Sequence, residues 1–304
     1  MRRAATSLVA ALVAGALAAP AAADAAVREF WVAAEPVTFN MTPTGRDHIT
    51  GRRLAPAETV LPTVVYRRYS AGWRKRLPNL PHQEAGVTGP LLRARAGDVL
   101  LVHFKNNDHL LKRPHSMHFH GVRYAPSSDG AFVPGVSGRD AAVPPGGTHR
   151  YVLRADDASV GAWPYHDHGP EMMPSIEGGM YGMLSIRGRR EPAPDREFVV
   201  PFAAMHGLQT IGGRAFVGNT PVLQAKAGEL VQFDVMAMGS EHHTFHVHGH
   251  RWSTADGTRD TQTVGPAESF RFRWRERDPG TWLYHCHVED HMMQGMIGLY
   301  RVRR

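Results

Sequence analysis

Residues 285–296 carry a cysteine, three histidines and a methionine at spacings that suit metal coordination. The cysteine, Cys286, is the only one in the chain and lies between two histidines. A thiolate, two imidazoles and a weakly bound thioether are the ligands of a blue-copper electron-transfer site. Cys286, His291 and Met296 supply three of these four ligands, which leaves the two flanking histidines to a second metal site. The alternative is a buried free thiol beside histidines that only pack.

The two flanking histidines, His285 and His287, are separated by one residue. Successive side chains of a strand point to opposite faces, so Cys286 would face one way and both histidines the other. Residues two apart on a strand are separated by about 6.6 Å, which lets the pair bind two neighbouring metal ions. One short strand would then connect a mononuclear copper to a metal cluster behind it.

Three further HxH units occur earlier in the chain, and an HxH unit on a strand places two imidazoles on one face. Together the four units contain eight histidines: His118, His120, His166, His168, His246, His248, His285 and His287. The third unit is extended to HxxHxH by His243, which would be the missing imidazole of the Cys286 site. A single HxH is weak evidence, but four of them, one surrounding the only cysteine, indicate a copper cluster.

The motifs HxHG, HxH, HxxHxH and HCHxxxHxxxxM, in this order, resemble those of multicopper oxidases. The resemblance covers nearly the whole chain after its N-terminal segment and implies four copper ions. It assigns the type 1 copper to His243, Cys286, His291 and Met296, and the type 2 copper to His118 and His246. It assigns the type 3 pair to His120, His166, His168, His248, His285 and His287. No ligand position departs from the family's pattern.

The N-terminal segment, residues 1–26, reads as a secretory signal peptide, with a basic start, a short apolar run and small residues at its end. We expect cleavage near Ala23 or Ala26 and export to the periplasm or the extracellular space, by the general or the twin-arginine route. No later segment resembles a membrane span. The net charge of +7 comes without a basic run interleaved with aromatics, which argues against a nucleic-acid partner.

The chain repeats itself with a period of about 120 residues, which is one domain length. Residues 89–98 resemble residues 220–229, and residues 161–168 resemble residues 280–287. Both copies contain short apolar and β-branched runs bounded by glycine, proline and asparagine, with almost no helical periodicity. We therefore predict an all-β chain of two tandem Greek-key β-sandwich domains, which the family resemblance specifies as cupredoxin-like. The predicted domains are residues 27–187 and 197–304, joined by a linker at 187–196.

The two copies differ at the blue-copper position. Domain 1 has His115 where domain 2 has a type 1 ligand, but Asp167 stands in place of the cysteine and Met172 in place of His291. A blue-copper site without its thiolate loses its defining bond. We expect one such copper per chain, in domain 2, with His115 a vestige or a supporting residue. Asp167 would orient a neighbouring imidazole.

In the family the three-copper cluster lies between two cupredoxin domains, each giving two histidine pairs. Two-domain members close as head-to-tail homotrimers, in which domain 1 of one subunit meets domain 2 of the next, and rings of this kind use heterologous contacts. The sequence also allows a cluster within one chain. For the protons that oxygen reduction needs, the resemblance points to Asp129, Asp260 and Tyr124, although the Asp-Gly pair at Asp129 also favours a plain turn.

The reaction implied is the oxidation of a reductant, one electron at a time, coupled to the four-electron reduction of O2 to water. We place a laccase-like oxidase of phenols or aromatic amines first. A metal oxidase acting on ferrous or cuprous ions is the alternative, because residues 34–68 and 89–106 resemble ceruloplasmin. Glu289 and Asp290 would hold a ferrous ion, and methionines near the sites would either handle cuprous ions or fill the core. A copper nitrite reductase would not need eight cluster histidines, and a copper-storage protein would not need the cysteine between them.

Overall fold

The structure is a computed structural model that describes residues 25–80, 83 and 86–304. Apart from its last two residues, the predicted signal peptide of residues 1–26 lies outside these ranges. Within them, no helix has both the length and the apolar character that crossing a membrane requires.

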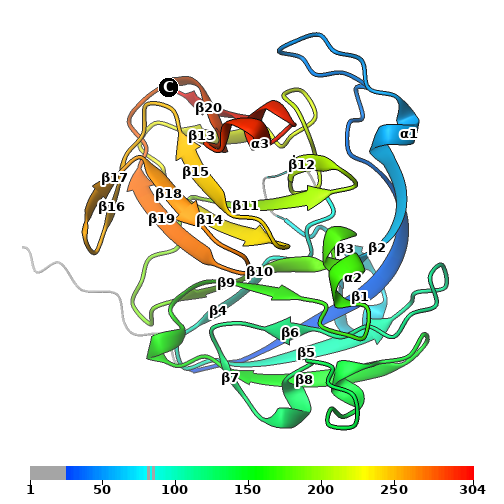
Figure 1. Cartoon of the computed structure of the whole chain (residues 1–304). Coiled ribbons are helices and arrows are strands. Elements are labelled where there is room, and N and C mark those ends of the chain that lie inside the picture. The colour runs from blue at the N-terminus through cyan, green and yellow to red at the C-terminus, as the bar shows by residue number, and fades with distance from the viewer. Residues whose placement is uncertain (1–24, 81–82, 84–85) are drawn as a thin grey trace, which may run out of the picture.

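Domain 1 is a sandwich of two sheets, drawn from blue to green in the lower half of Figure 1. The outer sheet has the strand order β3 (Arg76–Leu77), β2 (Val60–Tyr69), β1 (Val27–Asn40), β5 (Val99–Asn106), β8 (Thr148–Arg154), β7 (Arg123–Tyr124). The inner sheet, which faces domain 2, has the order β4 (Leu92–Arg95), β10 (Tyr181–Arg187), β9 (Gly161–His166), β6 (His118–Phe119).

Domain 2 is the second sandwich, drawn from yellow-green to red in the upper half of Figure 1. One sheet has the order β12 (Leu208–Ile211), β11 (Arg196–Met205), β14 (Leu230–Met238), β19 (Ser269–Arg275). The other has the order β13 (Leu223–Lys226), β21 (Ile297–Arg303), β20 (Gly280–Cys286), β15 (His243–Val247), β18 (Thr261–Val264). A two-stranded ribbon is formed by β16 (Trp252–Thr254) and β17 (Gly257–Arg259).

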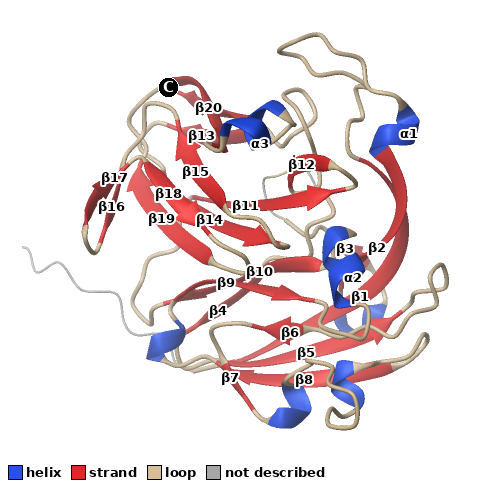
Figure 2. Ribbon diagram, viewed as in Figure 1, coloured by secondary structure: helices blue, strands red, loops and turns tan. Residues whose placement is uncertain are grey.

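Helices are few and short, as Figure 2 shows. The α-helices are α1 (Pro56–Thr59), α2 (Met172–Glu177) and α3 (Glu289–Met293). Single 3-10 turns are η1 (Ala71–Trp73), η2 (Pro126–Ser128), η3 (Arg139–Ala141) and η4 (Asp157–Ser159). The all-β prediction is therefore confirmed.

The internal repeat reappears as strand order. The arrangement β1-β5-β8 in domain 1 matches β11-β14-β19 in domain 2, and β4-β10-β9-β6 matches β13-β21-β20-β15. The first two strands of each set pair in parallel and the others antiparallel. One strand arrangement thus occurs twice within the described residues, and residues 188–195 lie between β10 and β11. The linker at 187–196 stays a prediction.

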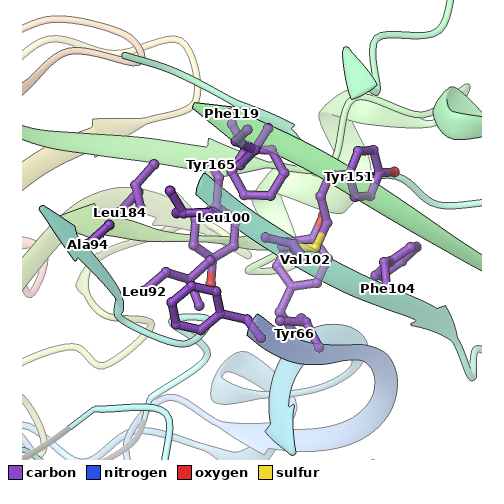
Figure 3. Close-up of a cluster of buried hydrophobic side chains, with 14 of the residues drawn as sticks. Tyr66, Leu92, Ala94, Leu100, Val102, Phe104, Phe119, Tyr151, Tyr165 and Leu184 are labelled. Atoms are coloured by element: carbon purple, nitrogen blue, oxygen red, sulfur yellow. Dashed lines mark hydrogen bonds between the residues drawn. The ribbon is translucent and has the colours of Figure 1, made fainter. Parts of the chain in front are cut away.

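Alternating burial produces the core of each sandwich, because the side chains of a strand point to opposite faces. In β5 every second residue is buried, and these residues meet the inner face of β9 and β10. Figure 3 shows the resulting cluster, which combines aromatic and aliphatic side chains. The labelled members are Tyr66, Leu92, Ala94, Leu100, Val102, Phe104, Phe119, Tyr151, Tyr165 and Leu184. In domain 2 the corresponding core contains Cys286 and Met296.

A largely inaccessible arginine, Arg271 of β19, links the two domains. Its guanidinium donates hydrogen bonds across the interface to the carbonyl oxygens of Gly161 (2.5 Å) and Ile186 (2.9 Å) in domain 1. Within domain 2 it lies 3.3 Å from the carboxylate of Asp234, which is fully buried. Burial raises the pKa of Asp234, nearby Glu197 adds to the rise, and Arg271 opposes it. The arginine therefore compensates a buried charge and holds the domains in one arrangement.

We predict that Arg271→Leu lowers the free energy of unfolding by about 3 to 5 kcal/mol, the usual cost of removing one partner of a buried ion pair. Adding Asp234→Asn should recover part of the loss, because the uncompensated carboxylate is then gone. Denaturant unfolding followed by tryptophan fluorescence measures both effects. The control is Arg275→Leu at the exposed end of the same strand, expected to cost about 0.5 kcal/mol or less. Equal losses for Arg271→Leu and Arg275→Leu would contradict this role.

Candidate metal centre

The thiolate site, defined as His243, Cys286, His291 and Met296, is assembled in domain 2. The Cys286 sulfur lies 3.8 Å from Nδ1 of His243 and 3.7 Å from Nδ1 of His291, and these nitrogens are 3.1 Å apart. Donor atoms at such separations fit around one ion at bond lengths of about 2.0 to 2.3 Å. Met296 is fully buried beside them, and its carbonyl oxygen accepts a hydrogen bond from the Cys286 amide.

The protonation of this site suits a metal ion. Burial lowers the pKa of His243 to about 3, and the neighbouring His291 adds to the effect, so the imidazole is neutral at pH 7 with a lone pair free to bind. Burial raises the pKa of the Cys286 thiol. A metal ion must therefore displace a proton from the sulfur when it binds.

Four histidines gather at one end of the domain 1 sandwich; we call His118, His120, His166 and His168 the domain 1 histidine set. Register places His118 opposite His166 where β6 pairs with β9. Nε2 of His120 lies 3.2 Å from Nε2 of His166, and the ring of His168 is 5.3 Å from that of His118 and 5.6 Å from that of His166. All four rings therefore converge on one small space.

Domain 2 repeats this arrangement in the domain 2 histidine set of His246, His248, His285 and His287. His246 stands opposite His285 where β15 pairs with β20. Nε2 of His248 lies 3.1 Å from Nε2 of His285, and the ring of His287 is 5.4 Å from both His246 and His285. His248 and His287 are exposed, so this set is open to the surface.

Strand β20 separates the two sites of domain 2, as the alternation of side chains predicts. Cys286 points into the core toward His243, whereas His285 lies on the other face with the histidine set. The strand ends at Cys286, and His287 follows in the next turn. The predicted geometry of the HCH segment is present, with its third residue just beyond the regular strand.

Main-chain carbonyl groups fix which nitrogen of each imidazole is available. Nδ1 of His118 donates to the carbonyl oxygen of Asp129 at 2.7 Å, and Nδ1 of His246 donates to that of Asp260 at the same distance. Nδ1 of His285 likewise contacts the carbonyl oxygen of Cys286 at 2.8 Å. Each of these imidazoles then presents Nε2 to a metal ion, which is how backbone acceptors orient metal ligands.

Burial keeps the enclosed members of both sets neutral. Burial, together with the neighbouring imidazoles, lowers the pKa of His120, His166 and His285 to about 4. Burial also lowers the pKa of His248. Neutral imidazoles whose Nε2 atoms face one another suit a metal ion, and the donor set fits copper.

The three predicted proton donors lie beside the histidine sets. The Asp129 carboxylate is 3.5 Å from Nδ1 of His118, and the ring of Tyr124 is 6.1 Å from that of His118. Burial raises the pKa of Tyr124, and the charge of Asp129 adds to the rise. Asp260 accepts from Thr261 Oγ1 at 3.2 Å. The positions suit proton transfer, and the transfer itself stays a prediction.

The glycines of the first and third HxHG motifs have a packing reason. Gly121 and Gly249 both have a φ near +72°, a conformation that glycine adopts without strain. A Cβ at Gly121 would lie 2.0 Å from the ring of Trp163, and at Gly249 it would lie 2.8 Å from the ring of Trp282. Each tryptophan thus packs directly against the turn that follows the histidine pair and leaves no room there for a side chain.

Sequence reasoning missed the carboxylate nearest to the thiolate site. Glu241 lies with its carboxylate 3.5 Å from Nε2 of His291, on the side of the ring opposite to the metal-facing Nδ1. Gln209 holds it through a 2.6 Å hydrogen bond. Glu241 stands two residues before His243, and this short spacing from a predicted ligand could have identified it. The carboxylates predicted to hold a ferrous ion, Glu289 and Asp290, adjoin His291 in the sequence.

Three of the methionines near the two sites pack into the core. Met180 and Met183 are buried in domain 1, and Met172 packs against the cluster between the domains. Met173 and Met293 are exposed. The gap-filling interpretation therefore holds for the first three.

Two family models described as multicopper oxidase match the chain, one over residues 82–191 and the other over residues 190–304. Among curated proteins, the chain is 28% identical to the human protein named Ferroxidase HEPHL1 (91% of this chain, 28% of that protein). It is 26% identical to Ceruloplasmin of Rattus norvegicus (79% of this chain, 26% of that protein). It is 30% identical to a probable nitrite reductase-hydroxylamine oxidoreductase fusion protein of Kuenenia stuttgartiensis (71% of this chain, 27% of that protein).

The chain spans less than a third of the length of these relatives. A solved structure described as a multicopper oxidase has a similar fold, with a TM-score of 0.69 at 23% identity over 91% of this chain and 89% of that one. The two family matches together run from residue 82 to residue 304 and contain every predicted copper ligand. The chain therefore belongs to the multicopper oxidase family.

Proposed function

We propose that this multicopper oxidase takes electrons singly from ferrous or cuprous ions and reduces dioxygen to water. Four ferrous ions, one dioxygen and four protons would give four ferric ions and two waters. The observation that carries the choice of a metal ion is the Glu241 carboxylate beside the edge of His291. The ferroxidase name of the relative described above supports the same choice.

Four copper ions per active unit would be held by the ligands that the resemblance assigns. Copper in these positions supplies both the one-electron oxidation of the reductant and the reduction of oxygen. Cys286 and its neighbours His285 and His287 belong to one continuous segment, so the thiolate site is tied covalently to the domain 2 histidine set. Asp129, Asp260 and Tyr124 are the proposed sources of protons.

Glu241 gives the thiolate site an affinity for a cation. Carboxylate oxygens suit ferrous ions better than they suit a neutral phenol, because the attraction is between opposite charges. The hydrogen bond from Gln209 holds the carboxylate at the partly exposed edge of His291. A ferrous ion bound there would lie one imidazole away from the position of the copper.

The laccase-like reaction, which the sequence alone placed first, needs the same copper ligands but no carboxylate at His291. The similarity to a protein named as a ferroxidase favours the metal-ion reaction. A nitrite reductase with a single type 2 copper would leave most of the eight set histidines without a purpose. Substrate comparison, described below, separates these reactions.

We also propose that the active form is a head-to-tail homotrimer. Each histidine set holds half of the ligands of a three-copper cluster, and each belongs to a different domain. Among the described residues, every ring contact between set histidines joins members of one set. Domain 1 of one subunit and domain 2 of the next would complete the cluster, and heterologous contacts of this kind close into rings.

Complementary apolar surfaces adjoin the two sets. Beside the domain 2 set lies a pocket of about 560 Å³ with Phe216, Met292 and Ile297 in its lining. Beside the domain 1 set, the loop at 131–138 is attached to His168 through a hydrogen bond from the Phe132 amide, and it exposes Val133 and Val136. In the proposed ring this loop would enter the pocket of the next subunit.

Export by the predicted signal peptide agrees with this proposal, because a single buried thiol needs no disulfide partner in an oxidising compartment. Amino-terminal sequencing of the secreted protein would locate the cleavage site.

Cys286→Ser should abolish the visible thiolate-to-copper charge-transfer band. It should also reduce oxygen consumption by more than about 100-fold, because changing a residue that only supports a metal ligand already costs about 10- to 100-fold. The reason is that serine cannot supply the thiolate that links the two copper sites. Absorption spectra and an oxygen electrode measure the two effects on copper-loaded protein. A variant that keeps both the band and full turnover would refute the proposed oxidase.

Glu241→Gln should raise KM for ferrous ion about tenfold, equivalent to about 1.4 kcal/mol, with little change for a dimethoxyphenol. The change removes the charge that attracts the ion but keeps the size of the side chain. Steady-state oxygen uptake with each reductant measures the effect, and Asp290→Asn is the matched control for an adjacent acid. An equal loss on both reductants, or turnover of the phenol alone by the wild type, would favour the laccase-like reaction.

Val136→Asp should dissociate the trimer and stop oxygen consumption while leaving the visible band intact. Val136 is 80% exposed in one chain, so a charge there spares the fold, but it would be costly inside an apolar pocket of a neighbour. Light scattering gives the mass, and Leu110→Asp is the control at another exposed apolar position. An active monomer would show that the cluster forms within one chain.

A further inference from the structure

Domain 1 retains the framework of a type 1 copper site. His115 forms a β-bridge with Val143, as His243 pairs with Val264 in domain 2. The amide of Asp167 donates to the carbonyl oxygen of Met180 at 3.0 Å, just as the Cys286 amide donates to that of Met296 at 3.1 Å. Met180 is therefore the counterpart of the axial methionine, and it is buried.

Asp167 occupies the place of the thiolate. In domain 2 the amide of Thr244 points at the Cys286 sulfur at 3.3 Å, and in domain 1 the amide of Ser116 donates to Asp167 Oδ1 at 2.8 Å. Asp167 also lies between two copper ligands of the domain 1 histidine set, as Cys286 does in domain 2. A carboxylate thus accepts the hydrogen bond that a copper-bound sulfur accepts in the other copy.

The imidazole of His115 is held from both sides by buried acids. Nδ1 lies 2.8 Å from Asp167 Oδ2, and Nε2 lies 3.1 Å from Asp108 Oδ2. Both acids are fully buried. In domain 2 the corresponding Nε2 of His243 has no hydrogen-bond partner. The contact with Asp108 is therefore a feature of domain 1.

The charges of this cluster are arranged to stabilise one another. Burial alone would lower the pKa of His115, but the hydrogen bonds and charges of Asp167 and Asp108 outweigh it, so the net shift is upward. Hydrogen bonds keep the pKa of both acids below the usual range despite their burial. The acids lie at opposite edges of the ring, so one metal ion could not contact both, and together they fix the orientation of the imidazole through its two ring nitrogens.

Asp167 Oδ1 ties together the two segments that carry the domain 1 ligands. Besides the Ser116 amide, it accepts a 3.1 Å hydrogen bond from the Gly169 amide. The Ser116 hydroxyl in turn accepts from the amide of His168 at 3.1 Å. The segment leading into His118 and the segment from His166 to Gly169 are thereby held in register.

We propose that Asp108, His115 and Asp167 take the place of the lost type 1 copper in domain 1 and position His118, His166 and His168 for the three-copper cluster. The hydrogen-bonded side chains replace a metal as the link between the ligand-bearing segments. Asp167 is thus a positioning residue, and Asp108 fixes the other edge of His115. This inference rests on the proposed copper chemistry of the histidine sets.

The test compares Asp167→Ala with Asp167→Asn by titrating copper into the metal-free protein without any reductant. We expect Asp167→Ala to weaken copper binding at the histidine sets by about 10- to 100-fold, the usual effect of losing a supporting contact. Asp167→Asn keeps an acceptor for the two amides and should restore most of the affinity. The near-ultraviolet absorption of the type 3 pair reports this site, and the visible band of domain 2 should stay unchanged.

If Asp167→Ala does not fold, Ser116→Ala replaces it, because this change removes only the hydroxyl between Asp167 and the His168 amide. It should weaken copper binding to the sets by several-fold with the visible band intact. Wild-type affinity in the variant tested, or no rescue by asparagine, would overturn the inference. If the wild type itself bound no copper at the sets, the proposed function would fail instead.

Discussion

The whole arrangement depends on the pairing of β15 with β20, which sets Phe245 opposite Cys286 and His246 opposite His285. Because neighbouring side chains of a strand point to opposite faces, this register sends the sulfur into the core and the imidazoles to the outer set. A slip of one residue would exchange the two sites. The core around Cys286, with Phe245 and Trp252, makes such a slip costly because it would bury an imidazole in place of an apolar ring.

The same pairing exists in domain 1, where His118 stands opposite His166, yet the chemistry there is different. One copy of the sandwich keeps a soft sulfur donor at the inner position, and the other keeps a hard carboxylate. Both copies hold an outer set of four histidines with the same main-chain acceptors. The two copies therefore share the outer set that is proposed to bind a common cluster, while the inner position differs.

The sequence predicted the all-β fold, and the structure brings the predicted ligand side chains close together, because the signals are local. The HCH segment, the three other HxH pairs and the glycine after each of these three lie within a few residues, and the repeat shows that they recur on equivalent strands. The contacts between Glu241 and His291 and between Arg271 and domain 1 join distant parts of the chain. The orientation of side chains across loops decides whether these contacts form, and the composition and spacing of the sequence do not reveal that orientation.

The thiolate site meets the surface through one ligand. His243, Cys286 and Met296 are fully inaccessible, whereas the His291 side chain is 15% exposed. An incoming copper ion must therefore pass the imidazole of His291. The proposed reductant would approach the same imidazole, so copper loading and substrate oxidation share one access route. A metal ion that lingers beside Glu241 would obstruct both, which makes copper delivery to the newly made protein sensitive to the very cations that it is proposed to oxidise.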